Sequence, residues 1–205
     1  MTHPLLLFLL CTFLSACGLP EGVPEATYTS KVGTAVATIT IKAPSPTATN
    51  VPKPFDAATS EAFYNLGLEY YSKGEIDNAI LAYDQAIQLK PDYAEAFYAR
   101  GLAYRNKDDL ARAISDYTQA IQIKPDYAFA YCNLGRTYGK LGRYSEAIEA
   151  FEKATRIKSD DAPAHYGLGL AYFYTKKKSM AVEQYEILKN LDVQLANKLY
   201  NVIYK

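Results

Sequence analysis

Two side chains in the second half of the chain are of the types that perform nucleophilic, acid–base or metal chemistry. His165 is the only histidine after His3, and Cys132 is the last of three cysteines. Catalysis and metal binding need convergent partners, and neither residue has another His or Cys at the spacing of a metal site or a catalytic base. We therefore expect a packed imidazole and a packed thiol, with no metal site, no catalytic residue and no enzyme activity.

Glycine and lysine residues can also bind phosphate or lipid headgroups. The glycines recur singly at fixed spacing and do not cluster in a phosphate-binding loop. The run Lys176–Lys178 fits either contact with anionic lipid or a solvated turn. Lys plus Arg and Asp plus Glu are both 22, so the chain has no basic excess that would attract nucleic acid. No cofactor, nucleic acid or small-molecule substrate is expected.

A third reactive residue, Cys17, follows an apolar run. Residues 4–16 (PLLLFLLCTFLSA) are too few to span a bilayer, which takes about 20 residues, and are typical of a signal peptide. The stretch Leu14–Cys17 (LSAC) resembles the bacterial lipobox, in which an aliphatic and two small residues precede the lipidated cysteine. The resemblance implies a signal peptide at 1–16, a lipid on Cys17, and a place on the extracytoplasmic face of the cell membrane or outer membrane. A secretory signal cut near residue 16, or an apolar helix end, is the alternative.

Residues 17–56 have the composition of a tether. Six of the ten prolines lie between residues 18 and 55, among many Thr, Ala and Val. Such a segment buries too little apolar surface to offset the entropy of ordering it. Residues 36–41 (VATITI) alternate like a strand, but no partner strand is evident. The sequence therefore predicts an extended linker before a domain at residues 57–205.

That domain repeats itself with a period of 34 residues. The stretch IQLKPDYAEAFY at 87–98 returns as IQIKPDYAFAYC at 121–132. A shift of 34 residues aligns these columns: Gly67, Gly101, Gly135 and Gly169; Tyr70, Tyr104, Tyr138 and Tyr172; Ala79, Ala113, Ala147 and Ala181; Tyr83, Tyr117, Phe151 and Tyr185. Four copies in register predict a stack of similar units.

Each copy has the pattern of two short helices. In the first copy Phe63, Gly67 and Tyr70 follow helical spacing, and a second apolar stripe runs from Ile76 to Ile87. The small residues of the Gly and Ala columns let two helices approach closely while aromatic rings fill the space beside them. Because one hairpin cannot bury its apolar face alone, the copies must stack. A last amphipathic segment at 192–204 is expected to form a helix that covers the final copy.

These columns resemble the tetratricopeptide repeat (TPR), which has an aromatic residue, Leu-Gly, Tyr, Ala, an aromatic residue, Ala and Pro at this spacing. The resemblance covers about residues 60–192. It implies an all-α solenoid of four helix–turn–helix repeats and a C-terminal capping helix, with repeats at about 60–93, 94–127, 128–161 and 162–195. Arg100 occupies a Leu position of the second repeat and is expected to expose that edge.

The resemblance also implies a concave groove, lined by the first helix of each repeat, that binds a protein or peptide partner. The groove candidates are Tyr64, Leu68, Tyr71, Tyr98, Leu102, Arg105, Asn106, Phe129, Asn133, Arg136, Lys140, Tyr166, Leu170, Phe173 and Tyr174. Aromatic and Arg side chains commonly anchor interfaces, and Arg105, Arg136 and Lys140 would form a cationic spot. The alternative for each candidate is packing against the neighbouring repeat. The first-repeat positions that clamp a C-terminal carboxylate in chaperone-binding relatives hold Tyr64 and Leu68 here, so that ligand is not expected.

The sequence thus predicts a lipid-anchored, extracytoplasmic module that binds a peptide or protein partner in its groove. The alternative is a structural or self-assembling subunit of a bacterial cell-envelope complex, which would stack through the edge of its terminal hairpin.

Overall fold

The computed structural model of the protein describes residues 27–32, 35–40 and 57–204, and the chain divides into two units, 1–51 and 52–205. Cys17, the apolar run before it and most of the proline-rich segment lie outside the described residues.

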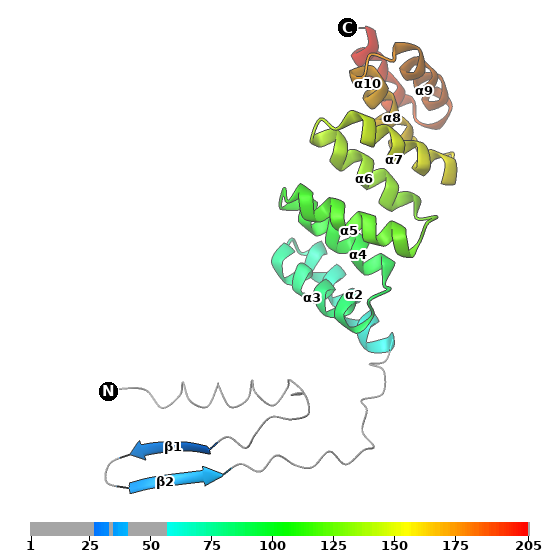
Figure 1. Ribbon diagram of the computed structural model, residues 1–205. Coiled ribbons are helices and arrows are strands. Elements are labelled where there is room, and N and C mark those ends of the chain that lie inside the picture. Colours follow the sequence, from blue (N-terminus) through cyan, green and yellow to red (C-terminus); the bar gives the residue numbers. More distant parts are fainter. Residues whose placement is uncertain (1–26, 33–34, 41–56, 205) are drawn as a thin grey trace. The chain divides into compact units, whose positions relative to one another are not determined.

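In the first unit, two strands form an antiparallel hairpin (Figure 1). Strand β1 (Thr27–Val32) pairs with β2 (Ala35–Thr40) in a register that joins Thr27 to Thr40 and Val32 to Ala35. The alternation at residues 36–41 therefore marks a strand, and the expectation that this strand has no partner is wrong. The partner was missed because Ser30 and Lys31 interrupt its run of strand-favouring residues.

The described part of the second unit is helical: four hairpins stack one upon another and a final helix follows (Figure 1). The hairpins are α2 (Ala57–Ser72) with α3 (Ile76–Leu89), α4 (Ala94–Asn106) with α5 (Leu110–Ile123), α6 (Ala128–Lys140) with α7 (Tyr144–Ile157), and α8 (Ala162–Tyr174) with α9 (Lys178–Leu191); the last helix is α10 (Val193–Tyr204). Each second helix packs against the first helix of the next hairpin, and α10 packs against α8 and α9. The predicted all-α solenoid of four hairpins with a capping helix is confirmed.

Backbone conformation sets where the helices end. The two helices of each hairpin are joined at a residue with positive φ, and these four residues again lie 34 apart: Gly74, Asp108, Gly142 and Lys176. A left-handed residue ends a helix and reverses the chain. The second helix α3 ends at Leu89 because Lys90 is extended (φ −135°, ψ 89°) before Pro91. The run Lys176–Lys178 is exposed around the fourth of these turns.

The Gly column is where the two helices of a hairpin come closest. A methyl group placed on Gly67 would lie 2.4 Å from Cε1 of Tyr83, and one on Gly135 would lie 2.9 Å from the ring of Phe151. No real side chain tolerates such a contact, so glycine is required if the ring is to pack flat on the first helix. The alanines that follow in the second helices are fully buried, namely Ala79, Ala113, Ala147 and Ala181.

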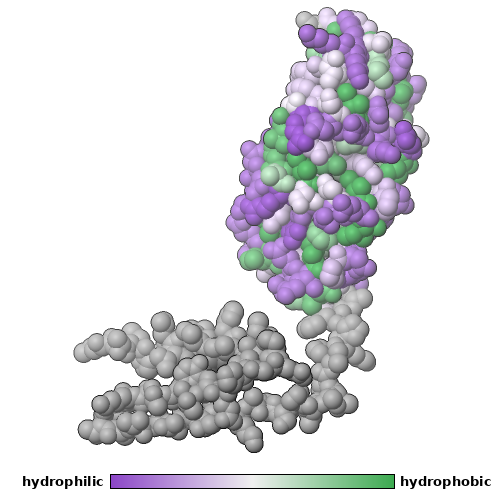
Figure 2. Space-filling model, in the orientation of Figure 1, coloured by the Kyte–Doolittle hydropathy of each residue, from purple (hydrophilic) through white to green (hydrophobic). Residues whose placement is uncertain are grey.

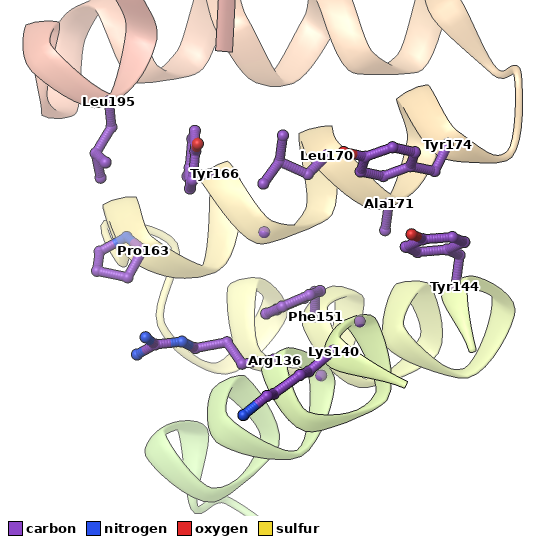
Figure 3. Close-up of a pocket in the computed structure, with 13 residues that line it drawn as sticks. Arg136, Lys140, Tyr144, Phe151, Pro163, Tyr166, Leu170, Ala171, Tyr174 and Leu195 are labelled. Carbon is purple, nitrogen blue, oxygen red and sulfur yellow. The ribbon is translucent and has the colours of Figure 1, made fainter. Parts of the chain in front are cut away.

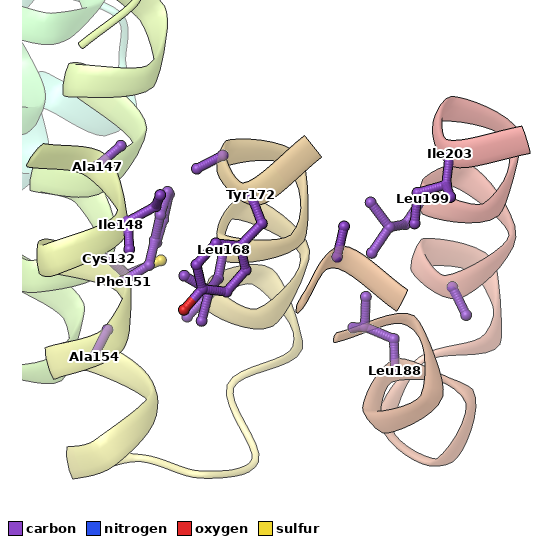
Figure 4. Close-up of a cluster of buried hydrophobic side chains, with 14 residues drawn as sticks. Cys132, Ala147, Ile148, Phe151, Ala154, Leu168, Tyr172, Leu188, Leu199 and Ile203 are labelled. Carbon is purple, nitrogen blue, oxygen red and sulfur yellow. The ribbon is translucent and has the colours of Figure 1, made fainter. Parts of the chain in front are cut away.

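The C-terminal hairpin and the capping helix share one apolar cluster with α7 (Figure 4). Phe151 of α7 faces Leu168 and Tyr172 of α8, while Leu199 and Ile203 of α10 lie on the opposite side of α8. Leu199 has no exposed surface, and a methyl group on Gly169 would lie 2.5 Å from its Cδ2. The helix α10 therefore continues the stack in place of a fifth hairpin.

Arg100 does not expose an edge of the second repeat, so that expectation is wrong. Its guanidinium donates to both carboxylate oxygens of Asp116 on α5, at 2.8 and 2.6 Å, and to Asp84 on α3 at 2.6 Å. Only 18% of the Arg100 side chain and 5% of the Asp116 side chain are exposed. We call these three residues the Arg100 network; a bidentate charged pair joins α4 to α5 within the second repeat, and the single contact with Asp84 joins the second repeat to the first.

Candidate interaction surface

The first helices of the hairpins, α2, α4, α6 and α8, form one continuous surface, which we call the groove face. Side chains link its neighbouring helices directly: Asn106 of α4 donates to the hydroxyl of Tyr71 on α2 at 2.9 Å, and Asn133 of α6 donates to the hydroxyl of Tyr98 on α4 at 3.0 Å. The helices α6 and α8 also pack against each other.

The structure divides the predicted groove residues into three groups. Leu68, Asn106, Phe129, Arg136, Lys140 and Tyr174 are exposed. Tyr64, Tyr71, Tyr98, Leu102, Arg105, Tyr166, Leu170 and Phe173 are partly buried. Asn133 is buried, with 8% of its surface exposed. The part that any of these residues takes in binding stays a prediction.

Asn133 is a bridge inside the protein. Its amide donates to Tyr98 and to the carbonyl of Phe129, at 3.0 and 2.9 Å, and its oxygen accepts from the guanidinium of Arg105. Both of its amide donors and its oxygen are thus directed at groups of α4 and α6. For Asn133 the alternative, packing against the neighbouring repeat, is the correct one.

Two of the candidate tyrosines also pack against the joints between repeats. The ring of Tyr64 lies 5.1 Å from that of Tyr93, and the ring of Tyr98 lies 5.0 Å from that of Tyr127, so the same contact returns after 34 residues. Burial raises the pKa of both Tyr64 and Tyr98 because the phenolate would be desolvated. These hydroxyls stay protonated at neutral pH and serve as hydrogen-bonding groups.

At the third joint this pair of rings is replaced by Cys132 and Asp161. The Cys132 thiol is buried, and desolvation with the nearby Asp161 carboxylate raises its pKa to about 11. A thiol with this pKa is protonated and a poor nucleophile at neutral pH. Cys132 is a packing residue, as predicted.

The three predicted groove cations differ in what they already bind. Arg105 donates to Asn133, and the ammonium of Lys140 lies 2.6 Å from a carboxylate oxygen of Asp108. Arg136 is exposed and makes no ion pair or hydrogen bond with any described residue. Arg136 is therefore the cation of this spot that can accept an external carboxylate without breaking an internal contact.

A pocket of about 590 Å³ opens on the groove face between α6 and α8 (Figure 3). Arg136 and Lys140 project from α6 toward the same side, and Tyr166 and Leu170 of α8 lie across from them. The remaining lining comes from α6, α7, α8 and α10: Gly135, Gly139, Tyr144, Phe151, Pro163, Gly167, Ala171, Tyr174 and Leu195. We call this cavity the α6–α8 pocket. Its size is that of a small-ligand or side-chain site.

Two aromatic rings close one end of the α6–α8 pocket. Tyr144 and Tyr174 are stacked, with centroids 4.7 Å apart and planes 15° apart, and Phe173 meets Tyr174 edge-on at 5.7 Å. Figure 2 shows hydrophobic residues among hydrophilic ones on the face of the helical stack that it draws.

Sequence reasoning missed the residues whose smallness makes this pocket. Gly139 lies in the column of Tyr71, Arg105 and Phe173, and a methyl group placed on it would meet nothing within 4 Å. The missing side chain of Gly139 was visible in the aligned repeats. The contributions of Tyr144 and Leu195 were not, since they come from a second helix and from the cap.

The described residues contain no cluster of three or more His, Cys, Asp or Glu side chains that could hold a metal ion. His165 is buried, with Nδ1 2.7 Å from Oε1 of Gln184 and Nε2 2.9 Å from the carbonyl oxygen of Ser159. It is a packed imidazole, as predicted. Within residues 27–32, 35–40 and 57–204, no helix is long and apolar enough to cross a membrane.

Comparison with known proteins identifies the family. Residues 67–108, 103–142 and 135–175, which together exceed half of the chain, match the family model described as TPR repeat. The chain is a TPR protein. TPR proteins are typically interaction modules without enzymatic activity, and TPR domains bind protein or peptide partners.

Solved TPR structures share the fold. The crystal structure of MamA has 31% sequence identity and a TM-score of 0.64, with 69% of this chain and 83% of that chain covered. The Arabidopsis OM64 TPR domain has 24% identity and a TM-score of 0.56, with 58% and 98% covered. The first TPR of Spaghetti (RPAP3), bound to the HSP90 peptide SRMEEVD, has 22% identity and a TM-score of 0.58, with 59% and 96% covered. The last two likenesses show the fold alone. No protein of curated function matches the TPR protein in sequence.

Proposed function

We propose that this TPR protein is a lipid-anchored, extracytoplasmic module that recruits a peptide or protein partner along its groove face. The observation that carries the binding role is the α6–α8 pocket with its free cation, on a surface that also exposes Leu68 (40%), Phe129 (52%) and Tyr174 (54%). Rigid aromatic and aliphatic groups beside an Arg are the composition of binding hot spots. A TPR domain that holds a peptide, as the Spaghetti domain does, provides the precedent for this fold.

The anchor and its location rest on the sequence. An apolar run at residues 4–16 followed by LSAC supports cleavage before Cys17 and acylation of its new N-terminus. The proline-rich residues that follow would separate the repeats from the lipid surface of the cell membrane or outer membrane. In this arrangement the lipid restricts the protein to the membrane surface, where the groove face recruits its partner.

Replacing Cys17 by serine tests the anchor. Serine has no thiol to acylate, so Cys17→Ser is expected to abolish incorporation of labelled palmitate and to move the protein from the membrane to the soluble fraction of the envelope. The measurement is fractionation with autoradiography in cells that express the full chain. Cys11→Ser is the matched control, because it changes a cysteine of the same apolar run and should leave labelling and fractionation unchanged. Membrane association that persists in Cys17→Ser would contradict the lipid anchor.

Site-specific photo-crosslinking tests the binding surface. A photoreactive side chain at Leu68 or Phe129, which are exposed on the groove face, is expected to form adducts of defined mass in living cells. The same group at Gln119 or Lys153, which are exposed on the second helices α5 and α7, should form none. Equal adducts from both sets of positions, or none from either, would contradict binding at the groove face.

The N-terminal edge of the repeats favours self-assembly as a second candidate function. Leu66 and Leu81 are 37% and 63% exposed there, and together with Phe63 and Tyr70 they line a shallow hollow of about 270 Å³. The opposite end of the stack is covered by α10. A self-assembling subunit would show a molar mass that rises with concentration in light scattering and falls to that of a monomer in Leu81→Glu. Constant monomer mass would exclude this candidate.

A further inference from the structure

We propose that the α6–α8 pocket receives one bulky apolar side chain of an acidic peptide segment, whose carboxylate pairs with Arg136. This inference rests on the proposed function and names the chemistry of the partner at one place on the groove face. It concerns positions of the third and fourth repeats other than those of the carboxylate clamp considered above.

The pocket exists because two positions are glycine where the third repeat meets the fourth, whereas at the other junctions these two positions carry side chains. The column of Gly139 holds Tyr71, Arg105 and Phe173 in the other repeats, and the column of Gly167 holds Asn65, Ala99 and Asn133. A methyl group on Gly167 would lie 2.3 Å from the ring of Phe151, so the helix backbone itself forms part of the wall. Gly139 also lines the pocket, and the space beside it is open.

The walls of the pocket select an apolar group. Tyr166, Leu170 and Leu195 supply carbon surface on one side, Phe151 lies at its base, and the Tyr144–Tyr174 stack closes an end (Figure 3). A cavity of about 590 Å³ holds a Leu or Phe side chain together with part of the backbone that carries it. Burial of such a side chain supplies affinity in proportion to the apolar area removed from water.

The charge at the rim selects an acidic neighbour. Arg136 and Lys140 are the charged residues that line the pocket, and no carboxylate lines it. Lys140 is occupied by Asp108, which leaves the Arg136 guanidinium to bind a carboxylate with two parallel hydrogen bonds. Lys140 adds long-range attraction for the same sign of charge.

The continuity of the pocket with the groove face favours a peptide over a free fatty acid. The pocket lies on the groove face, where α4 and α6 also carry the partly buried Leu102 and the exposed Phe129. An extended chain can place one side chain in the pocket while its neighbours lie on this surface. A single acyl chain would leave that surface uncovered.

Peptide selection followed by matched variants tests the inference. The unit 52–205 contains all of the helices and cores described above, so it can be purified and used to select from a random 12-residue peptide library. We expect the selected peptides to combine Leu, Ile, Met or Phe with an Asp or Glu within about three residues, and to bind more weakly as salt rises.

Gly139→Tyr fills the pocket with a residue that this column already holds at Tyr71, and is expected to weaken binding of the selected peptides roughly 10-fold or more. Gly139→Ala is the matched control. It also removes the helix-destabilising glycine but leaves the pocket open, so it should bind the peptides as the wild type does. Both variants should unfold at a temperature equal to or above that of the wild type, which separates a filled pocket from a damaged fold.

Arg136→Gln is expected to weaken binding by roughly 10-fold and to remove most of its salt dependence, because a charged hydrogen-bonded pair is lost. Arg156→Gln, at an exposed position on α7 outside the pocket, is the control and should have no effect.

The outcomes distinguish the proposed groove-face function from the assignment of the α6–α8 pocket. Peptides that bind equally well to Gly139→Tyr and Arg136→Gln would overturn this inference and leave the groove-face function standing. Failure to select any peptide would overturn this inference, while photo-crosslinking at Leu68 and Phe129 decides the groove-face function. Displacement of a selected peptide by oleate with the same sensitivity to Gly139→Tyr, together with selected peptides that lack acidic residues, would assign the pocket to an acyl chain and overturn the peptide assignment.

Discussion

Asp116→Ala is expected to lower the free energy of unfolding by about 3 kcal/mol, toward the lower end of the cost of breaking a buried ion pair. Arg100, whose side chain is 18% exposed, would lose the two hydrogen bonds made by Nε and Nη2 and keep only the one from Nη1 to Asp84. The loss is measured by chemical denaturation of the unit 52–205, followed by helical circular dichroism.

A double variant separates the contribution of the Arg100–Asp116 pair from that of the packing around it. Arg100 lies in the column of Leu66, Leu134 and Leu168, and Asp116 lies in the column of Ala82 and Ala150. Arg100→Leu with Asp116→Ala therefore installs a pair that other repeats already use, and is expected to restore stability to near the wild-type value or above it. If instead the double variant loses as much stability as the two single variants together, Arg100 and Asp116 each stabilise the protein independently of their pairing.

An exposed pair supplies the control for Asp116→Ala. Lys73 and Glu69 form an ion pair at 2.5 Å with side chains 52% and 58% exposed. Because water screens and solvates both partners, Lys73→Ala should change stability little.

Leu199→Ala in the capping helix is expected to lower the free energy of unfolding by about 3 kcal/mol, within the range for truncation of a buried leucine. Leu199 is fully buried and lies against the backbone of α8 at Gly169. The shortened side chain leaves a cavity that the helical stack cannot close, because α8 is held on its other side by Phe151 of α7. Chemical denaturation again measures the loss, together with the change in hydrogen-exchange protection of α8 and α9.

Lys198→Ala is the control for the capping helix, since Lys198 precedes Leu199 on α10 and is exposed. It keeps the helix and removes no buried surface, so stability should stay close to that of the wild type. Equal behaviour of Leu199→Ala and Lys198→Ala would show that α10 does not unfold together with the repeats.

The sequence by itself determined the architecture of the repeats. The Gly and Ala columns, with the aromatic residues between them, predicted paired helices in register, and the structure places an aromatic ring on the glycine of each of the first three repeats. The prediction of the architecture was correct because its signals are local and recur in each repeat. Helical spacing, small residues at close approaches and extended residues before proline all lie within one repeat of about 34 residues. The all-α solenoid with its cap followed from these local rules.

The sequence predicted less well wherever a side chain meets a partner on another helix. Arg100 looked like an exposed substitution, yet Asp84 and Asp116, each 16 residues away, bury it between α3 and α5. Asn133 looked like a groove residue and is a bridge between α4 and α6. The choice between an exposed and a paired polar group depends on distances across the stack, which spacing along the chain does not give.

Tertiary structure likewise decided which of the predicted groove cations already have partners inside the protein. The sequence named three cations of equal standing, and the packing of the repeats leaves Arg136 free while Arg105 and Lys140 have partners. The α6–α8 pocket depends on the absence of a side chain at Gly139 and on walls contributed by Tyr144 and Leu195, from three different helices. A cavity is a property of the space between elements, so it exists only once the helices are packed, and no pattern along one of them encodes it.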